Sequence, residues 1–376
     1  MSWTHRERLL AALNHEEADR IAIDFGSTPA SGISVPAYEA LKAHLGWRHD
    51  TVIADRIGDL VALDESALRR FDVDVRALGF GVAPREIDHD TLCDEWGVTW
   101  HRAPDGAFMP VDGPFRGRPA ELSDLEDWAW PDPHDPEYTR GLAARAEALA
   151  QSSDCAILLC LPAMPVHVGQ CQRGFAEWLK DLRRNPQYVS RMMDIVADLW
   201  IAIVGQALAA VGDKVDVVFV GDDLASQEGP LFSPSLYREL VKPRHGRMIA
   251  AVKASCDAKI LYHSCGAVFP MIEDLIEIGV DVLNPVQTSA KGMDPEGLKE
   301  AFGKRLSFWG GIDTQLILPY GSPHEVAAET RRVVDILGAG GGYVMAASHS
   351  VQPEVPAENV LAMFDVVLEG GRRNAA

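Results

Sequence analysis

The sequence has few cysteines and no signal-like apolar start. Its six cysteines, among 376 residues, form no Cys-x-x-Cys pair, which predicts reduced thiols rather than a disulfide framework. The first residues, Met1 to Arg8, are polar, and no later apolar run approaches the roughly 18 residues that a membrane helix needs. We therefore expect a cytoplasmic protein that is not inserted in a membrane.

Positive charge is also scarce. Lysine and arginine total 35 against 55 aspartates and glutamates, so the formal net charge is −20. Such a chain repels nucleic acid and anionic lipid, and it favours a small or a basic partner. The chain is 47% hydrophobic, which is enough to bury a large core.

Short apolar runs alternate with longer amphipathic stretches along most of the chain, the pattern of repeated βα units. Eight runs predict strands, at 21–25, 75–80, 156–160, 215–220, 259–262, 280–283, 306–309 and 343–346. Eight parallel strands close a barrel that side chains fill, so we predict an α/β fold of the (β/α)8 TIM type, as one domain over 1–376. An open doubly wound sheet is the alternative, although no Gly-x-Gly-x-x-Gly motif follows a strand to support nucleotide binding.

The segment from about 85 to 133 interrupts this alternation. Tryptophan and phenylalanine are interleaved there with glycine, which predicts an antiparallel hairpin insertion after the second strand. The insertion either covers the mouth of the barrel or forms the contact of a homodimer. Further on, 174–184 predicts a helix with Phe175 and Trp178 in the core and with Arg173 and Lys180 in solvent.

The most distinctive motif is His263-Ser264-Cys265-Gly266, which follows the predicted strand 259–262. Residues two apart at a strand end point the same way, and the carboxyl ends of barrel strands form the active-site face. Imidazole nitrogen and thiolate sulfur are ligands that zinc prefers, and Gly266 permits a sharp turn of the backbone. The alternative is a buried cysteine beside a hydrogen-bonded histidine.

A second histidine, His349, follows the last predicted strand. In a closed barrel His263, Cys265 and His349 could meet at one Zn²⁺, and three protein ligands leave a fourth position open, as in catalytic zinc sites. The alternative for His349 is a loop histidine bonded to the backbone.

Polar side chains follow other predicted strands as well. Asp222 and Asp223 come after 215–220 and Asp24 lies at the end of 21–25, and each could orient a metal ligand or a polar substrate group. For Asp222 and Asp223 the alternative is capping of a helix. Three more candidates for the rim of the mouth are Asn284, Gln287 and Asp313.

Four motifs together resemble the uroporphyrinogen decarboxylase superfamily. They are His263 to Gly266, the Gly-Gly-Ile-Asp at 310–313, the Gly-Gly-Gly-Tyr at 340–343 and the Pro-Ala-Glu-Asn at 356–359. The resemblance extends over nearly the whole chain and implies a distorted (β/α)8 barrel. The superfamily contains tetrapyrrole decarboxylases and zinc-dependent methyltransferases that exchange methyl groups with corrinoid proteins.

The residues distinguish these two branches. The decarboxylases carry an arginine-rich stretch after the first strand that holds substrate carboxylates, whereas this chain has Ile23 to Ala30 there, without arginine. The methyltransferases carry the His-x-Cys motif, which is present. Their third ligand is usually a cysteine, and a histidine at 349 would make the zinc a stronger Lewis acid, better suited to polarising an oxygen.

The resemblance therefore implies a zinc-dependent methyltransferase that moves a methyl group between a small methylated substrate and a corrinoid (cobalamin). The corrinoid is expected on a partner protein, because the Asp-x-His-x-x-Gly cobalamin signature is absent from the sequence. Methoxylated aromatics, methylamines and methyl thioethers all fit as donors. A decarboxylase or lyase acting on a carboxylated substrate is the alternative enzyme, and a metal-containing binding protein, with a closed four-ligand metal, is the alternative outside the enzymes.

Overall fold

The computed structural model describes residues 3–103 and 106–374 of the chain. Within these residues the main sheet has eight strands, and every adjacent pair of them is parallel. The strands are β1 (Ala22–Ile23), β4 (Val75–Leu78), β9 (Ala156–Cys160), β10 (Val217–Gly221), β11 (Lys259–His263), β12 (Val282–Asn284), β13 (Ser307–Trp309) and β14 (Tyr343–Met345). Each overlaps one predicted run, so the predicted (β/α)8 barrel is confirmed.

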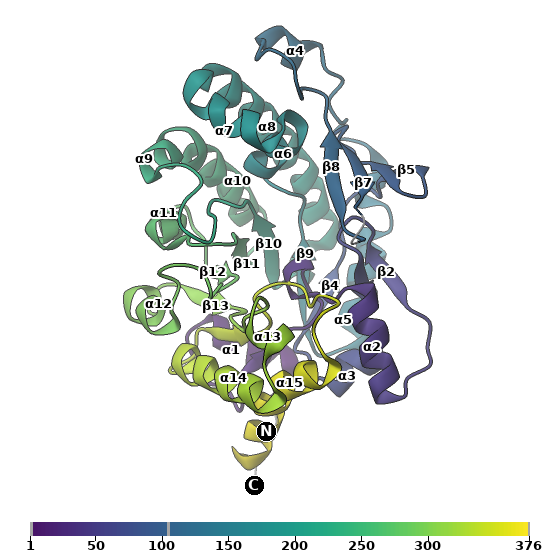
Figure 1. The fold of residues 1–376 in the computed structure, drawn as a ribbon, viewed down its shortest axis with the longest axis vertical. Coiled ribbons are helices and arrows are strands. Elements are labelled where there is room, and N and C mark those ends of the chain that lie inside the picture. Colours follow the sequence, from purple (N-terminus) through teal and green to yellow (C-terminus); the bar gives the residue numbers. More distant parts are fainter. Residues whose placement is uncertain (1–2, 104–105, 375–376) are drawn as a thin grey trace.

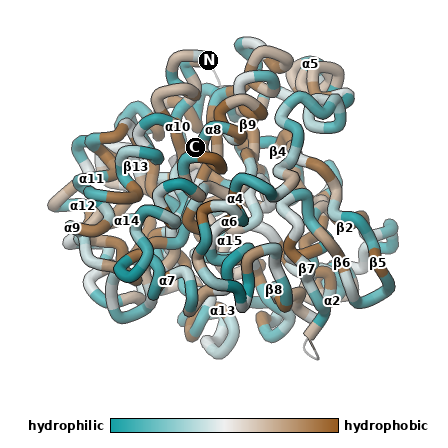
Figure 2. The backbone as a smooth tube through the Cα atoms, turned by 90° about the horizontal axis from the view of Figure 1, so that it is seen from above, coloured by the Kyte–Doolittle hydropathy of each residue, from teal (hydrophilic) through white to brown (hydrophobic). Residues whose placement is uncertain are grey.

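The strands follow one another around the barrel in chain order, from β4 through β9 to β14 and then to β1. Almost all of their residues are buried, since the barrel interior and the surrounding helices cover both faces. Figure 1 shows the strands at the centre with helices around them, and in Figure 2 brown, hydrophobic tube marks strands such as β9. The carboxyl ends of the strands therefore meet at one mouth, as the site prediction requires.

The barrel closes between β1 and β4 through Asp74 rather than through a regular strand ladder. The Asp74 N–H donates to the Ile23 carbonyl over 2.9 Å, and the Ile23 N–H donates to Asp74 Oδ2 over 2.7 Å. Arg8 and Arg20 each bind the same buried carboxylate over 2.6 Å. One ionic cluster thus joins β1 to the start of β4 in place of a regular strand ladder.

Helices follow most of the strands and cover the barrel. The first, α1, begins with a capping box in which Thr4 and Glu7 bind each other's backbone N–H groups, as predicted. The barrel helices are α1 (His5–Leu13), α2 (Val35–Leu45), α3 (Glu65–Arg70), α5 (Leu142–Ser152), α6 (Pro165–Arg173), α7 (Phe175–Arg184), α8 (Pro186–Val211), α9 (Pro234–Leu236), α10 (Lys242–Ser255), α11 (Ile272–Glu277), α12 (Pro295–Phe302), α13 (Ile317–Tyr320), α14 (Pro323–Gly338) and α15 (Ala357–Asn374). Short 3₁₀ segments lie at Pro29–Ser31, Pro136–Thr139, Gly212–Lys214 and Phe269–Met271, and a π-helical turn lies at Tyr237–Val241.

Helix α8 corrects one prediction from the sequence. Together with the turn after it, Pro186–Lys214, this helix is long and apolar enough by length and composition to cross a membrane, so a run of that kind does exist. In the structure its apolar side chains pack into the core at helical spacing, as Met192, Val196 and Trp200 do. A single helix of this composition is weak evidence for a membrane span, because buried core helices have the same composition.

The insertion between β4 and β9 is larger than one hairpin. It forms a four-stranded antiparallel sheet of β5 (Arg85–Asp88), β6 (Thr91–Cys93), β7 (Thr99–Arg102) and β8 (Phe108–Asp112), followed by α4 (Leu122–Asp127). Its Trp96 and Val98 pack with Val168 and Cys171 of α6. A separate hairpin of β2 (Val52–Asp55) and β3 (Leu60–Ala62) follows α2 (Figure 1). The insertion thus rests on the helix that follows β9.

The predicted exposure of two residues, Arg173 and Phe175, is wrong. Arg173 is buried, and it donates hydrogen bonds to the Phe115 carbonyl over 2.7 Å and to Asp181 over 2.7 Å. Phe175, predicted in the core, has 52% of its surface exposed. The insertion covers the side of the helix on which Arg173 lies, so the arginine becomes the anchor of the insertion instead of a solvated charge.

Candidate metal centre

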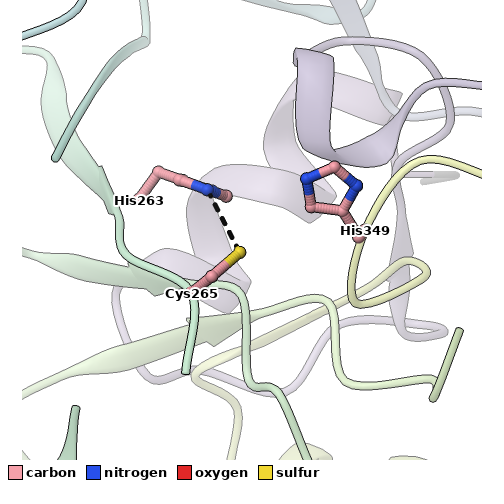
Figure 3. Close-up of side chains that lie close together, drawn as sticks. All are labelled: His263, Cys265 and His349. Atoms are coloured by element: carbon pink, nitrogen blue, oxygen red, sulfur yellow. Dashed lines mark hydrogen bonds between the residues drawn. The ribbon is translucent and has the colours of Figure 1, made fainter. Parts of the chain in front are cut away.

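His263 and Cys265 lie together at the carboxyl end of β11. His263 is the last residue of this strand, and its Nε2 lies 3.5 Å from Cys265 Sγ (Figure 3). The two side chains point to the same side because one residue separates them in an extended segment. The predicted His-x-Cys pair thus presents one nitrogen and one sulfur to the same point.

His349 reaches the same point from the loop after β14. The donor atoms of His263, Cys265 and His349 all lie within 4.8 Å of one another. The two imidazole rings are 6.3 Å apart between centroids, and Figure 3 shows the His349 ring opposite the other two side chains. His349 Nδ1 is within 3.0 Å of Ser350 Oγ, which leaves Nε2 for a metal ion.

Asn284, at the end of the neighbouring strand β12, fixes the orientation of the His263 ring. Its Oδ1 lies 2.7 Å from His263 Nδ1, and its Nδ2 donates to the Trp309 carbonyl over 3.4 Å. The carbonyl oxygen of Asn284 accepts the hydrogen of Nδ1, so the Nε2 lone pair is directed at the metal position. This residue, which the sequence suggested for the rim, supports a ligand instead.

The backbone around Cys265 is also held in place. The Cys265 N–H donates to Asp223 Oδ1 over 2.9 Å, and the Gly266 N–H donates to Gln287 Oε1 over 2.6 Å. Gly266 has a φ of +87°, and a Cβ atom there would lie 2.5 Å from the Ser226 carbonyl oxygen. Only glycine fits this close approach. Two nitrogens and one sulfur on a fixed frame suit zinc, so the residues present fit the metal.

The two histidines have different pKa values. Burial lowers the pKa of His263, but Cys265, Asp223 and the bond to Asn284 together raise it to about 9. His349 is exposed at the wall of the open cavity, but the protein around the cavity still removes much of the water from its ring, and this desolvation together with the charge of His263 lowers the pKa of His349 to about 4. A metal ion would therefore meet a neutral His349 and would displace a proton from His263.

The three candidate carboxylates have different surroundings. Asp223 has 44% of its side chain exposed, lines the cavity and lies 3.7 Å from His263 Nε2. Asp222 points the other way and accepts the N–H groups of Val166 and His167 over 2.9 and 2.7 Å, at the start of α6. Asp24 is buried below the mouth, where it accepts from Trp309 Nε1 over 2.8 Å, and burial raises its pKa.

Two further candidates have structural partners. Gln287 binds the Gly266 N–H, as described above, and therefore supports the loop of Cys265. Asp313 accepts three backbone N–H groups, from Gln315, Leu316 and Ile317, at the start of α13. Among the rim candidates, Asn284 and Gln287 thus act on the ligands, and Asp313 caps a helix.

A cavity of about 390 Å³ opens beside the three ligands. His263, His349 and Asp223 form part of its wall, and the remainder is formed by Pro29, Ala30, Asp55, Leu161, Pro162, Ala163, His167, Phe219, Gly221 and Asp222. His167 was missed by the analysis of the sequence, because it lies inside α6 and not at the end of a strand. Its place two residues after a proline that starts a helix was the available signal.

A second cluster of metal-ligand types, His5, Asp154 and Cys155, lies at a separate cavity of about 360 Å³. Both ring nitrogens of His5 are already taken, Nδ1 by Asp154 over 2.8 Å and Nε2 by Asp72 over 2.9 Å. These two carboxylates raise the pKa of His5 against the effect of burial. The cluster is therefore a charged bridge between Asp72 and Asp154 and not a metal site.

A model of the uroporphyrinogen decarboxylase (URO-D) family matches residues 162–370. The chain belongs to this family. URO-D relatives include the uroporphyrinogen decarboxylase of Alkalilimnicola ehrlichii, 25% identical over 98% of this chain and 94% of that protein. The methylated-thiol–coenzyme M methyltransferase of Methanosarcina mazei is also 25% identical, over 82% of this chain and 84% of that protein. The structure of a methyltransferase from Methanosarcina mazei has the same fold, with a TM-score of 0.65, 18% identity, and coverage of 98% of this chain and 99% of that one.

Proposed function

We propose that this URO-D family member is a zinc-dependent methyltransferase that moves a methyl group between a small methylated substrate and a corrinoid protein. The convergence of His263, Cys265 and His349 within 4.8 Å, beside a cavity large enough for a small molecule, carries the proposal. These three residues would hold the zinc. When bound, zinc supplies Lewis acidity that lowers the pKa of a thiol or draws charge from an ether oxygen.

The residues around the ligands have separate tasks in this proposal. Asn284 keeps the hydrogen of His263 on Nδ1, and Gln287 and Asp223 hold the backbone of the Cys265 loop. Asp223 is also the carboxylate that we assign to substrate contact, since it is half-exposed on the cavity wall. Asp222 supports the cavity by holding the start of α6, and Asp24 supports it by accepting a hydrogen bond from the Trp309 side chain.

A decarboxylase is the second candidate, because the relative from Alkalilimnicola ehrlichii carries that name and aligns with 98% of the chain. A substrate with several carboxylates needs cationic side chains to bind it. In the described part of the chain, none of the residues that line the cavity is lysine or arginine, while Asp55 and Asp223 add negative charge. The lining therefore favours methyl transfer over decarboxylation of a polycarboxylate.

The corrinoid in this proposal is carried by a separate protein, as the resemblance to the methyltransferase branch implies. The related protein from Methanosarcina mazei, named as a methyltransferase of methylated thiols, supports a methyl group as the transferred unit. We propose the cytoplasm as the site of action.

The test offers the zinc-loaded chain a reduced corrinoid protein and a panel of methylated donors, namely methoxylated aromatics, methyl thioethers and methylamines. Loss of the methyl group from one donor, matched by methylation of the corrinoid, is the expected result. The control is Cys256→Ala, a cysteine outside the site, beside Cys265→Ala, which should be inactive. Release of CO₂ from uroporphyrinogen, with no methyl transfer, would instead establish the decarboxylase.

A further inference from the structure

His245 is a buried histidine that belongs neither to the cavity wall nor to the three candidate metal ligands. It lies on α10, which runs outside β10 and β11 (Figure 1), and its side chain has no exposed surface. Its Nε2 lies 2.9 Å from Oδ2 of Asp222, whose side chain is also fully buried. Buried polar groups need partners inside the protein, so the surroundings of this pair fix its geometry.

Two tyrosine hydroxyl groups hold the other ring nitrogen of His245. The hydroxyl oxygens of Tyr237 and Tyr262 lie 3.4 and 3.3 Å from Nδ1. Burial raises the pKa of both tyrosines, so each keeps its hydroxyl hydrogen at neutral pH. With Asp222 at Nε2 and the hydroxyl groups at Nδ1, both ring nitrogens have partners, and the ring is held in one orientation.

The π-helical turn at Tyr237–Val241 brings Tyr237 to His245. Residues seven apart share a face of an α-helix, because seven residues make about two turns, whereas residues eight apart do not. Tyr237 and His245 are eight apart, but the Lys242 N–H donates to the Tyr237 carbonyl five residues back, which adds one residue to the turn. The added residue returns Tyr237 to the face of His245. Such turns are rare and occur often at functional sites.

Tyr262 connects His245 to the first metal ligand. It precedes His263 in β11, and neighbouring side chains of a strand point to opposite sides. The contact of the Tyr262 hydroxyl with His245 holds the outer side of this strand end. The direction of the His263 ring toward the cavity is therefore held from the back of the strand.

Asp222 connects His245 to the second metal ligand. The residue after it, Asp223, accepts the Cys265 N–H at Oδ1 over 2.9 Å. Asp222 and Asp223 point in opposite directions, one to His245 and the other to the Cys265 loop. Fixing the Asp222 carboxylate therefore also fixes the backbone from which Asp223 reaches Cys265.

The Asp222 carboxylate also holds the opposite wall of the cavity. It accepts the N–H groups of Val166 and His167 at the start of α6, and His167 lines the cavity. A single carboxylate thus joins the wall to the loop of a metal ligand, and His245 is the side chain that orients this carboxylate.

We propose that His245 is a positioning residue of the metal centre. It holds Asp222 and Tyr262 in one orientation, and through them it sets where His263 and Cys265 lie relative to the start of α6. It touches neither zinc nor substrate. This inference rests on the zinc site of the proposed function and adds a residue outside the cavity on which zinc affinity depends.

The test measures the zinc affinity of the full chain by competition with a chelator, so that it does not depend on turnover. His245→Leu removes both ring nitrogens, His245→Gln keeps a donor for Asp222, and Tyr262→Phe removes one hydroxyl group. The matched control is Val252→Ala, at another fully buried position of α10. The melting temperature of each variant is measured as well.

We expect His245→Leu to weaken zinc binding about 10-fold, the lower end of the effect of residues that support a metal ligand directly. His245→Gln should stay within about 3-fold of the native affinity, because its amide can donate to Asp222. Tyr262→Phe should lie between the native chain and His245→Leu. Val252→Ala should lower the melting temperature and leave the affinity unchanged.

Amide hydrogen exchange gives a second reading that needs no metal. In His245→Leu the N–H groups of Val166 and His167 should exchange about 10-fold faster than in the native chain, because their acceptor, Asp222, has lost the partner that orients it. In Val252→Ala these groups should exchange at the native rate. Exchange within α14 is the internal reference.

Native zinc affinity in His245→Leu would overturn the inference. An equal loss in His245→Leu and Val252→Ala would overturn it too, since His245 would then be an ordinary core residue, and so would a loss in His245→Gln as large as in His245→Leu. If His245→Leu does not fold, native affinity in Tyr262→Phe decides against the inference.

A failure of the proposed function has a different signature. The native chain would then bind zinc without transferring a methyl group, and the order of the variants in zinc affinity would be unchanged. If the native chain bound no zinc at all, exchange at the start of α6 would decide, and a native rate in His245→Leu would overturn the role of His245.

Discussion

Replacing Asp74 by asparagine tests whether one ionic cluster closes the barrel. The buried carboxylate accepts from Arg8 and Arg20 over 2.6 Å each and from the Ile23 N–H over 2.7 Å. Burial raises the pKa of Asp74 in spite of the two arginines, so the cluster itself adds little net stability. Asp74→Asn would nevertheless be costly, because it removes the buried charge that both guanidinium groups share and leaves Arg8 only with Asp19 and Arg20 only with Asp72 as carboxylate partners.

The expected loss is about 3–5 kcal/mol, the cost of removing one partner of a buried ion pair. Unfolding entropy is about 2.1 cal/mol/K per residue, so for 376 residues this loss lowers Tm by about 4–6 °C. Differential scanning calorimetry measures the shift. The control is Asp198→Asn, whose pair with Arg247 is exposed by 66% and 47%, and which should change Tm by about 1 °C or less. Equal shifts in both variants would refute the role of Asp74.

Two other substitutions test the support that Asn284 gives to a metal ligand and the raised pKa of Glu95. Asn284→Leu removes the acceptor of His263 Nδ1 and should weaken zinc binding about 10- to 100-fold in a competition with a chelator, whereas unchanged affinity would deny its supporting role. Burial, with a smaller effect of Asp94, raises the pKa of Glu95 to about 7. The unfolded chain therefore loses this proton first, and stability falls as the pH rises from about 4.5 to about 7. Glu95→Gln should show a smaller fall of Tm over this interval, and parallel Tm profiles would contradict the assignment.

The barrel was predictable because its strands are buried on both faces and appear as short apolar runs. The ends of the strands were less predictable. β11 extends to His263 and β10 extends to Gly221, and a search for apolar runs does not include a polar residue or a glycine at a strand end. The composition of the insertion indicated antiparallel strands but not their number. Arg173 was misplaced because helical periodicity cannot show that another segment covers that side of the chain.

The candidate site was predictable where the chemistry lies at strand ends. His263, Cys265 and His349 were found in this way, and the structure brings them together. Whether they bind zinc stays a prediction. The different directions of Asp222 and Asp223 depend on where α6 begins, which one sequence does not reveal. His167 was not predicted as a site residue, because it reaches the cavity from helix α6 and not from the end of a strand.

The measurement that tests the central claim most directly is the metal content of the native chain beside Cys265→Ala and His349→Ala, with Cys256→Ala as the control. Each protein is purified without chelator, offered zinc and examined by elemental analysis. The account predicts about one zinc per chain in the native and control proteins and its loss in the two site variants, since three ligands form the site. A native chain that binds no zinc would contradict the account.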